Sequence, residues 1–314
     1  MVASKLNFFL IGAPKAGTTL IHARMSGHPQ VFLSPLKEPN HHATDIDPAV
    51  FSKAFKANLP PDLGLYFDQK PLAPRQIGFV RDPDEYASLF DEATSEHRVI
   101  GECSTSYLWS QEAASNVAKA HPEAKILVAL RNPVERLYSH WQMARKYGFT
   151  TLPLMEAVAQ DQSHPSPGWG RSELFVEAGL YADGLRRWTS RFSKGQVKVV
   201  LNEHLNEPQT WEDLAGWLGV EGPLPEAGQG AGNPAGMAKW QGVNAWVTRS
   251  GLKSLASKRL PRGVKRRLVR HWYTDHGLPK MTPEERAGLL PFFESDIQQT
   301  EALTGFDLSH WVTP

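Results

Sequence analysis

The sequence has a single cysteine, Cys103, among its 314 residues. One cysteine cannot form a disulfide within the chain, which is typical of proteins from a reducing compartment. Neither sign of charge dominates, because 34 Lys and Arg oppose 33 Asp and Glu and leave a formal net charge of +1. The overall charge therefore gives no reason to expect a nucleic-acid partner. Charged residues make up 21% and hydrophobic residues 41%, a composition that excludes a disordered, collagen-like or coiled-coil chain.

Long apolar runs are also missing. The first apolar run, residues 8–11, is too short for the apolar region of a signal peptide, and a Gly-containing loop follows it. No stretch approaches the roughly 18 uninterrupted apolar residues of a membrane span. We therefore expect a cytoplasmic, soluble protein with no transmembrane segment.

Strand-like and helix-like patterns alternate along the first two-thirds of the chain. Strands are predicted at residues 7–11, 98–102, 125–130 and 197–201, and helices at 16–25, 111–120, 133–147 and 182–192. This alternation predicts an α/β fold, a single domain over residues 1–314 with a central parallel β-sheet flanked by helices. Its core covers about residues 5–205, and a helical, basic part covers about 237–314. Three Pro- and Gly-rich stretches are too long for simple connectors, so we expect active-site loops or mobile lids at residues 58–84, 161–173 and 219–236.

The strongest local signal is a P-loop-like phosphate-binding loop at residues 12–19. A buried strand runs into this loop and the loop runs into a helix, which directs backbone N–H groups and the helix dipole at one point. Gly12 and Gly17 have the spacing of a Walker A loop, but Thr18 stands at the position of the Walker lysine, and Lys15 lies three positions earlier. The loop therefore predicts an anion site without the features of a Mg²⁺–nucleotide site.

A second anion site is predicted where the strand at 125–130 ends. Arg131 follows this strand, and Ser139 lies about two turns into the helix that begins near Pro133. Ligands of open α/β sheets bind at the carboxyl ends of the strands, and a guanidinium group binds phosphate in a bidentate manner.

These segments resemble those of the sulfotransferases that use 3′-phosphoadenosine 5′-phosphosulfate (PAPS). Gly-Ala-Pro-Lys-Ala-Gly-Thr-Thr at 12–19 resembles their 5′-phosphosulfate loop, and Arg131 to Ser139 resembles their 3′-phosphate motif, R-[DN]-P-x-x-R-x-x-S. Ser-Pro-Leu-Lys-Glu-Pro-Asn at 34–40 resembles the K-E-P motif of the bacterial and heparan-sulfate-type branch. The resemblance covers roughly residues 5–205. It implies that PAPS is the donor and that its sulfuryl group passes by direct in-line displacement to a hydroxyl or amine, leaving 3′,5′-ADP and requiring no metal.

The resemblance also implies roles for individual residues. The expected PAPS-binding residues are Lys15, Ala16, Gly17, Thr18, Thr19, Arg131 and Ser139, with Lys239 as a weaker match in a loop that closes over the nucleotide. Glu38 is the expected general base, Lys15 stabilises charge on the leaving oxygen, and Lys37 steers the sulfonate or pairs with Glu38. His41 and His42 are the alternative bases. They lie one and two places beyond the position where the motif usually has histidine, which holds Asn40 here.

Two regions fit the pattern less well. The family segment G-E-K-[ST]-P-x-Y is matched by residues 101–107 with Cys103 at the lysine position and Thr105 at the proline position, and Tyr107 is expected at the pocket wall. Residues 249–272 contain nine Lys or Arg and no acid. We expect that its basic side chains form the solvated face of a helix, or that they bind an anionic acceptor, the nucleotide or an acidic membrane surface.

The residues do not identify the acceptor, which is a small molecule, a lipid or a glycan. Ten Trp and the aromatic residues of the long loops favour an apolar or ring-bearing acceptor. Two other functions remain as alternatives, a P-loop kinase-like enzyme and a non-catalytic nucleotide-binding protein. The missing Walker lysine opposes the first, and the altered segment around Cys103 is the main support for the second.

Overall fold

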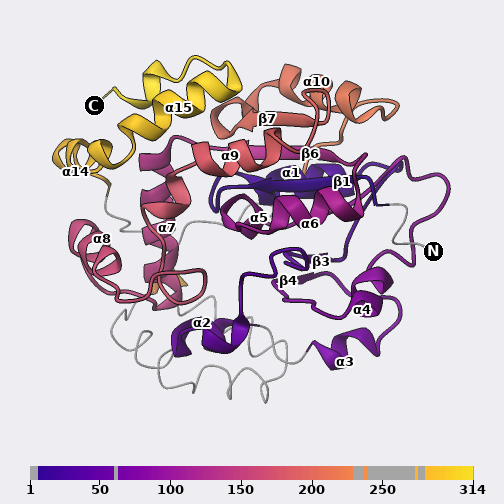
Figure 1. Cartoon of the computed structure of the whole chain (residues 1–314), viewed down its shortest axis with the longest axis horizontal. Helices are drawn as coiled ribbons and strands as arrows, with labels where there is room; N and C mark the ends of the chain where they lie inside the picture. The colour runs from indigo at the N-terminus through magenta and orange to yellow at the C-terminus, as the bar shows by residue number, and fades with distance from the viewer. Residues whose placement is uncertain (1–5, 60–62, 229–236, 239–272, 275–279, 314) are drawn as a thin grey trace.

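The structure is a computed structural model that describes residues 6–59, 63–228, 237–238, 273–274 and 280–313. Strands and helices alternate along the first two-thirds of the chain, as the sequence predicts (Figure 1). The strands are β1 (Phe8–Gly12), β2 (Val31–Leu33), β3 (Leu36–Lys37), β4 (Arg75–Gln76), β5 (Val99–Cys103), β6 (Lys125–Leu130), β7 (Val197–Leu201), β8 (Met237–Ala238) and β9 (Tyr273–Thr274). The described α-helices are α1 (Thr18–Ser26), α2 (Lys53–Asn58), α3 (Gly64–Phe67), α4 (Pro83–Ser88), α5 (Ser106–Trp109), α6 (Ala113–Ala120), α7 (Pro133–Tyr147), α8 (Leu154–Gln162), α9 (Ala182–Thr189), α10 (Pro208–Leu218), α14 (Pro283–Leu289) and α15 (Glu294–Thr304).

Five strands form the central sheet in the order β2-β5-β1-β6-β7. All four neighbouring pairs are parallel, so the predicted parallel α/β fold is confirmed. The edge strand β2 was not predicted, because three residues are too few to show a strand period. Two-stranded pairings of β3 with β4 and of β8 with β9 lie outside this sheet.

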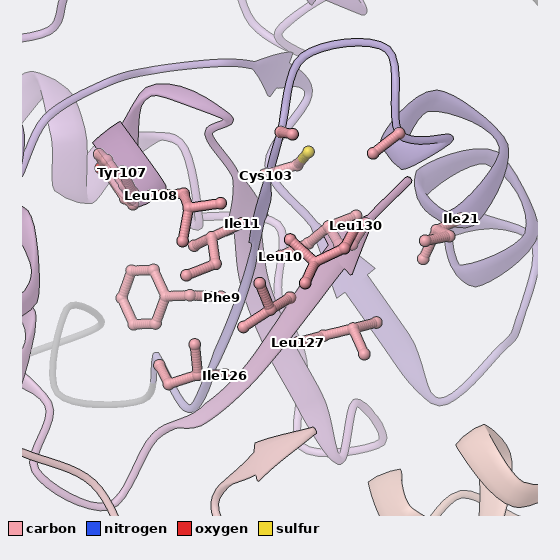
Figure 2. Packing of buried hydrophobic residues seen from close by; sticks show 14 of the residues in the cluster. Phe9, Leu10, Ile11, Ile21, Cys103, Tyr107, Leu108, Ile126, Leu127 and Leu130 are labelled. Atoms are coloured by element: carbon pink, nitrogen blue, oxygen red, sulfur yellow. The ribbon is translucent and has the colours of Figure 1, made fainter. Parts of the chain in front are cut away.

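Helices cover both faces of the sheet. Figure 2 shows Phe9 and Ile11 of β1 on the side of Tyr107 and Leu108 of α5, because alternate side chains of a strand point to the same face. Leu127 of β6 lies on the opposite side, which faces Ile21 of α1. β1 and β6 are almost fully buried, as expected for central strands of a parallel sheet with both faces covered.

The order of the strands fixes where a ligand binds. From β1 the chain passes first to β2 and β5 on one side and then to β6 and β7 on the other. The connections therefore reverse direction between β1 and β6, and the crevice beyond the carboxyl ends of such strands is the usual ligand site of an open α/β sheet. The loop after β1 and the residues after β6 both begin at this crevice.

The end of the chain packs back against this region. Asp296 of α15 accepts hydrogen bonds from the backbone N–H groups of Tyr181 and Ala182 at the start of α9. The Asn132 side chain donates to the carbonyl of Trp311. The predicted basic segment 249–272 and Lys239 lie outside the described residues. Within the part of the chain that the structure describes, no helix is both long enough and apolar enough to cross a membrane.

Candidate active site

A cavity of about 590 Å³ opens where the predicted crevice lies. The chain segments that form it come from the loop after β1, the residues around β3, the start of α5 and one face of α7. Eight of the residues predicted from the sequence line it: Lys15, Gly17, Thr18, Thr19, Lys37, Glu38, Arg131 and Ser139. Residues spread over more than 120 positions of the sequence thus meet in one place.

The phosphate loop approaches the sheet so closely that two of its positions require glycine. Gly12 has a φ of 139°, and a Cβ there would lie 2.2 Å from the carbonyl oxygen of Ala129 on β6. Gly17 has a φ of 93°, and its Cβ would lie 2.5 Å from Leu205. Gly17 is also the N-cap of α1 and gives the helix no side-chain cap, so the first amide groups of α1 remain available to an anion.

Two cations flank the mouth of this loop. Arg131 Nη1 donates a hydrogen bond of 3.3 Å to the backbone carbonyl of Lys15. Burial and the charge of Arg131 lower the pKa of Lys15, and burial lowers the pKa of Arg131. Among the described residues no acid pairs with Lys15, and Glu135 lies 4.0 Å from Arg131. An anion bound between them would relieve this repulsion.

The helix that carries Ser139 begins at a well-formed cap. The side chain of Asn132 accepts hydrogen bonds from the amides of Val134 and Glu135, and Pro133 occupies the first helical position. This cap fixes how α7 leaves the end of β6, so that Ser139, two turns later, lines the cavity beside Arg131. Arg136, between them, is fully buried and donates to the carbonyl of Phe175, which makes it part of the packing rather than of the cavity wall.

Lys37 and Glu38 form a buried ion pair at the cavity, with 2.6 Å between Nζ and Oε1. Burial disfavours the ammonium group, but Cys103 and Glu38 more than offset this effect and raise the pKa of Lys37. Glu38 lies in the left-handed region, with a φ of 66°. Lys37 thus both neutralises Glu38 and orients it, which agrees with the pairing expected from the sequence.

Residues 103–106, at the end of β5 and directly after it, hold the turn that carries Glu38. Cys103 accepts a hydrogen bond from the Glu38 amide through its carbonyl, and its fully buried thiol has a pKa that burial raises to about 12. Thr105 donates to Glu38 Oε2 from both its amide, at 2.6 Å, and its hydroxyl, at 2.9 Å. Asn40 holds the same turn. Its backbone amide donates to Ser104 Oγ, and its side-chain carbonyl accepts from Ser106 Oγ.

The structure does not bring His41 and His42 to this cavity. His41 stacks on Tyr86 with 3.9 Å between ring centroids, and its Nδ1 lies 2.9 Å from the carbonyl of Val80. His42 is buried in an aromatic cluster with Phe9 and Tyr86, and burial lowers its pKa well below the usual value. Both imidazoles therefore pack behind the turn that carries Glu38 rather than face the cavity.

Two further expected positions have other surroundings, and a third lies outside the described residues. Ala16 is fully buried and its amide donates to the carbonyl of Ala13, so it supports the loop from behind and does not line the cavity. Tyr107 is also fully buried, and its hydroxyl donates to Glu102 Oε1 rather than lining the wall. Lys239 lies outside the described residues.

The cavity also contains an acid and a histidine that sequence reasoning missed. Arg136 Nη1 lies 3.2 Å from His140 Nδ1, and an arginine can only donate, so Nδ1 accepts and Nε2 carries the hydrogen of a neutral ring. Nε2 lies 3.8 Å from the carboxylate of Glu173. Burial, with a smaller contribution from Asp161, raises the pKa of Glu173 to about 8. Glu173 is the last residue of segment 161–173, which the sequence already predicts to be an active-site loop or lid.

Backbone strain is concentrated in the same place. Five non-glycine residues of the described chain have a positive φ: Lys15, Glu38, Asn40, Ile77 and Leu174. All five line the cavity. Such conformations cost of order 1–3 kcal/mol each and gather at functional sites, where the surrounding structure holds them.

A part of the cavity lining is aromatic. It is formed by Phe55, Phe79, Tyr147, Phe149 and Trp169. The rings of Phe55 and Phe149 lie 6.3 Å apart and nearly parallel. The cavity therefore combines cations from the phosphate loop and the end of β6 with aromatic side chains from α2 and other segments.

Comparison with known proteins agrees with this geometry. A family model described as "Sulfotransferase family" matches residues 7–165, about half of the chain. The chain belongs to the sulfotransferase family. The matched range contains the phosphate loop, the Lys37–Glu38 pair and both Arg131 and Ser139.

Individual sulfotransferases are more distant. Carbohydrate sulfotransferase 15 of Rattus norvegicus is 28% identical over 255 residues, which cover 70% of this chain and 44% of that protein. The bifunctional heparan sulfate N-deacetylase/N-sulfotransferase 2 of Bos taurus is 26% identical over 222 residues, or 68% of this chain and 22% of that protein. The chain thus spans less than half the length of the curated relatives it matches. A solved sulfotransferase from Alicyclobacillus acidocaldarius superposes with a TM-score of 0.66 and 28% identity, over 98% of this chain and 99% of that one.

Proposed function

We propose that the protein transfers the sulfuryl group of PAPS to a hydroxyl or amine of an acceptor molecule. The observation that carries the proposal is the convergence of two anion-binding ends and one carboxylate in a single cavity. Lys15 and the start of α1 form the first end, and Arg131 and Ser139 form the second. Glu38 lines the same cavity. PAPS has two separate phosphate ends and a reacting sulfuryl group, so it matches this arrangement.

The donor site is supported by the charge and the backbone of the chain itself. Lys15 and the exposed amides of α1 suit a 5′-phosphosulfate, because they combine a full charge with helix N–H groups. Arg131 and Ser139 suit a 3′-phosphate, since a guanidinium fork and a hydroxyl both donate to phosphate oxygens. Lys15 has no acidic partner among the described residues, and Arg131 has only the 4.0 Å contact with Glu135, so an anionic ligand would stabilise this part of the cavity.

The transfer itself needs little covalent chemistry from the protein. A bond forms between the acceptor oxygen or nitrogen and sulfur while the bond from sulfur to the 5′-phosphate oxygen breaks, and that oxygen leaves with 3′,5′-ADP. Glu38 takes the proton of the acceptor as general base, and Lys15 stabilises the negative charge on the departing oxygen. Lys37 keeps Glu38 in place through their 2.6 Å contact.

The aromatic lining of the cavity indicates the class of acceptor. Phe55, Phe149 and Trp169 offer flat apolar surfaces within the same cavity as Glu38. The curated relatives carry names that refer to carbohydrates and heparan sulfate. The aromatic rings favour a ring-bearing acceptor among the small molecules, lipids and glycans that the family chemistry allows.

The donor is tested by calorimetric titration of the full chain with 3′,5′-ADP and with ATP, each with and without Mg²⁺. We expect binding of 3′,5′-ADP, and we expect Lys15→Ala to weaken it while the exposed-residue control Lys194→Ala does not. Tighter binding of Mg²⁺–ATP than of 3′,5′-ADP would instead favour a kinase-like enzyme.

The transfer is tested with ³⁵S-labelled PAPS and a panel of phenols, sterols, fatty alcohols and neutral or acidic sugars. We expect label in at least one ring-bearing acceptor. Tight binding of 3′,5′-ADP without transfer to any acceptor or to water would favour a non-catalytic nucleotide-binding protein.

A further inference from the structure

The two oxygens of the Glu38 carboxylate have different surroundings. Oε1 accepts one hydrogen bond, from Lys37 Nζ at 2.6 Å. Oε2 accepts two, from the amide and the hydroxyl of Thr105 at 2.6 and 2.9 Å. A carboxylate oxygen has two lone pairs, so the described contacts saturate Oε2 and leave one lone pair on Oε1.

Thr105 is well placed to impose this asymmetry. It is 8% exposed and follows β5 at the start of α5, so its backbone is held by the central sheet. It also lines the same cavity as Glu38. Glu38, in contrast, lies on a turn with a φ of 66°, which by itself would not hold the side chain in one orientation.

Resting on the proposed function, we propose that Thr105 is the positioning residue of this site: it anchors Oε2 of Glu38 through two donors, so that Oε1 takes the proton of the acceptor. The amide contact belongs to this chain in particular. Proline, which the related pattern has at this position, lacks an N–H group and cannot make it. Thr105 also lines a smaller cavity with Gly12, Ala13 and Pro14 of the phosphate loop, but its amide and its hydroxyl both donate to Glu38, so we expect its effect to pass through Glu38.

Substitutions at Thr105 can separate the two donors. Thr105→Ser keeps both of them, and Thr105→Val keeps the shape and the amide but removes the hydroxyl. Thr105→Pro removes both, and its ring is compatible with the observed φ of −69°. Thr94→Val is the matched control, since Thr94 is exposed and its hydroxyl contacts His97 outside the cavity.

The assay measures transfer of ³⁵S from PAPS to 2-naphthol and to water, together with the affinity for 3′,5′-ADP. We expect kcat to fall about tenfold in Thr105→Val and about 100-fold in Thr105→Pro, because a misplaced base loses most of its contribution. Thr105→Ser and Thr94→Val should stay within about threefold of the parent chain. Affinity for 3′,5′-ADP should not change in any variant, which separates a role at Glu38 from a general loss of structure.

The outcomes are distinct. Full activity of both Thr105→Val and Thr105→Pro, with an active parent chain, would overturn the role of Thr105 and leave the proposed function intact. If Thr105→Pro does not fold, Thr105→Val and its rescue by Thr105→Ser decide the question alone. An inactive parent chain on every acceptor and on water would overturn the proposed function, and the role of Thr105 with it.

Discussion

Arg131 at the end of β6 donates a hydrogen bond to the backbone carbonyl of Lys15 in the loop after β1. This contact joins two segments that are 116 residues apart and brings two cationic side chains into one cavity. Without a bound anion the two charges oppose each other, and burial adds to this by lowering the pKa of each group. We therefore predict that the pair binds a ligand with more than one negative group.

The first prediction concerns the assignment of Arg131 to the 3′-phosphate. Arg131→Ala should weaken the binding of 3′,5′-ADP by about 2 kcal/mol or more, because a charged phosphate contact is lost. Binding of adenosine 5′-phosphosulfate, which lacks the 3′-phosphate, should change little. Titration calorimetry measures both, with the exposed Arg191→Ala as control. Equal losses for the two ligands would contradict the assignment.

The second prediction concerns Glu38. Glu38→Gln keeps the shape of the side chain but removes its ability to take a proton, so the transfer rate should fall by about 10²–10⁴-fold. Affinity for 3′,5′-ADP should remain, and the exposed control Glu96→Gln should behave as the parent chain.

His41 and His42 provide a further comparison. His41→Ala and His42→Ala should lower the free energy of unfolding more than the rate, because both rings are packed with Tyr86 rather than facing the cavity. A histidine variant as inactive as Glu38→Gln is expected to be, with Glu38→Gln itself active, would reverse the assignment of the base.

The third prediction is a pH dependence of stability that originates at Glu102. This carboxyl group is fully buried under Tyr86, Tyr107 and Ser104, and burial raises its pKa from 4.5 to about 7 although all three hydroxyls donate to it. The folded state therefore binds the proton more tightly than the unfolded state. Its stabilising contribution is complete below about pH 4.5 and is lost as the pH rises to about 7.

Glu102→Gln removes this titration. The unfolding free energy of the variant relative to the parent chain should rise between pH 5 and pH 8 by on the order of 2–3 kcal/mol. Urea denaturation at several pH values measures the difference. A difference that stays constant over this range would show that Glu102 does not titrate there.

The fourth prediction compares two glycines. Gly12→Ala would bring a Cβ to 2.2 Å from the backbone of β6 at a φ of 139°, so the phosphate loop must move or the chain must unfold. Gly216, inside α10, has nothing within 4 Å of the same atom. Gly216→Ala should therefore stabilise the protein by about 0.5–1 kcal/mol through helix propensity. Thermal unfolding and 3′,5′-ADP binding test both, and a Gly12→Ala chain with parent-like stability and affinity would contradict the close approach.

Much of the site could be predicted because parallel strands place their carboxyl ends at one edge. Once residues 7–11 and 125–130 were expected as buried strands of one parallel sheet, the loop with Lys15 and the arginine at 131 were expected at the same edge of that sheet. The structure places both residues in one cavity, as this reasoning requires. Strand β2 could not be predicted in the same way, since its three residues are too short to carry a pattern.

Side-chain surroundings were harder to anticipate. His41 and His42 follow Glu38 by only a few positions, yet they point into an aromatic cluster formed by Phe9, Tyr86 and Tyr107. Local sequence carries no information about which side of the turn is buried, because this depends on segments that arrive later in the chain. The same reason explains why the His140–Glu173 contact was missed.

By itself, the sequence determined the chemistry that is local in the chain: the two glycines of the phosphate loop, the Asn132 cap that starts α7, and the adjacent Lys37 and Glu38. Tertiary structure alone decided that Thr105, 67 residues from Glu38, donates twice to one oxygen of its carboxylate. Hydrogen bonds between such distant residues depend on how neighbouring segments pack against the sheet, and that packing is set by the burial of the whole core rather than by any local pattern.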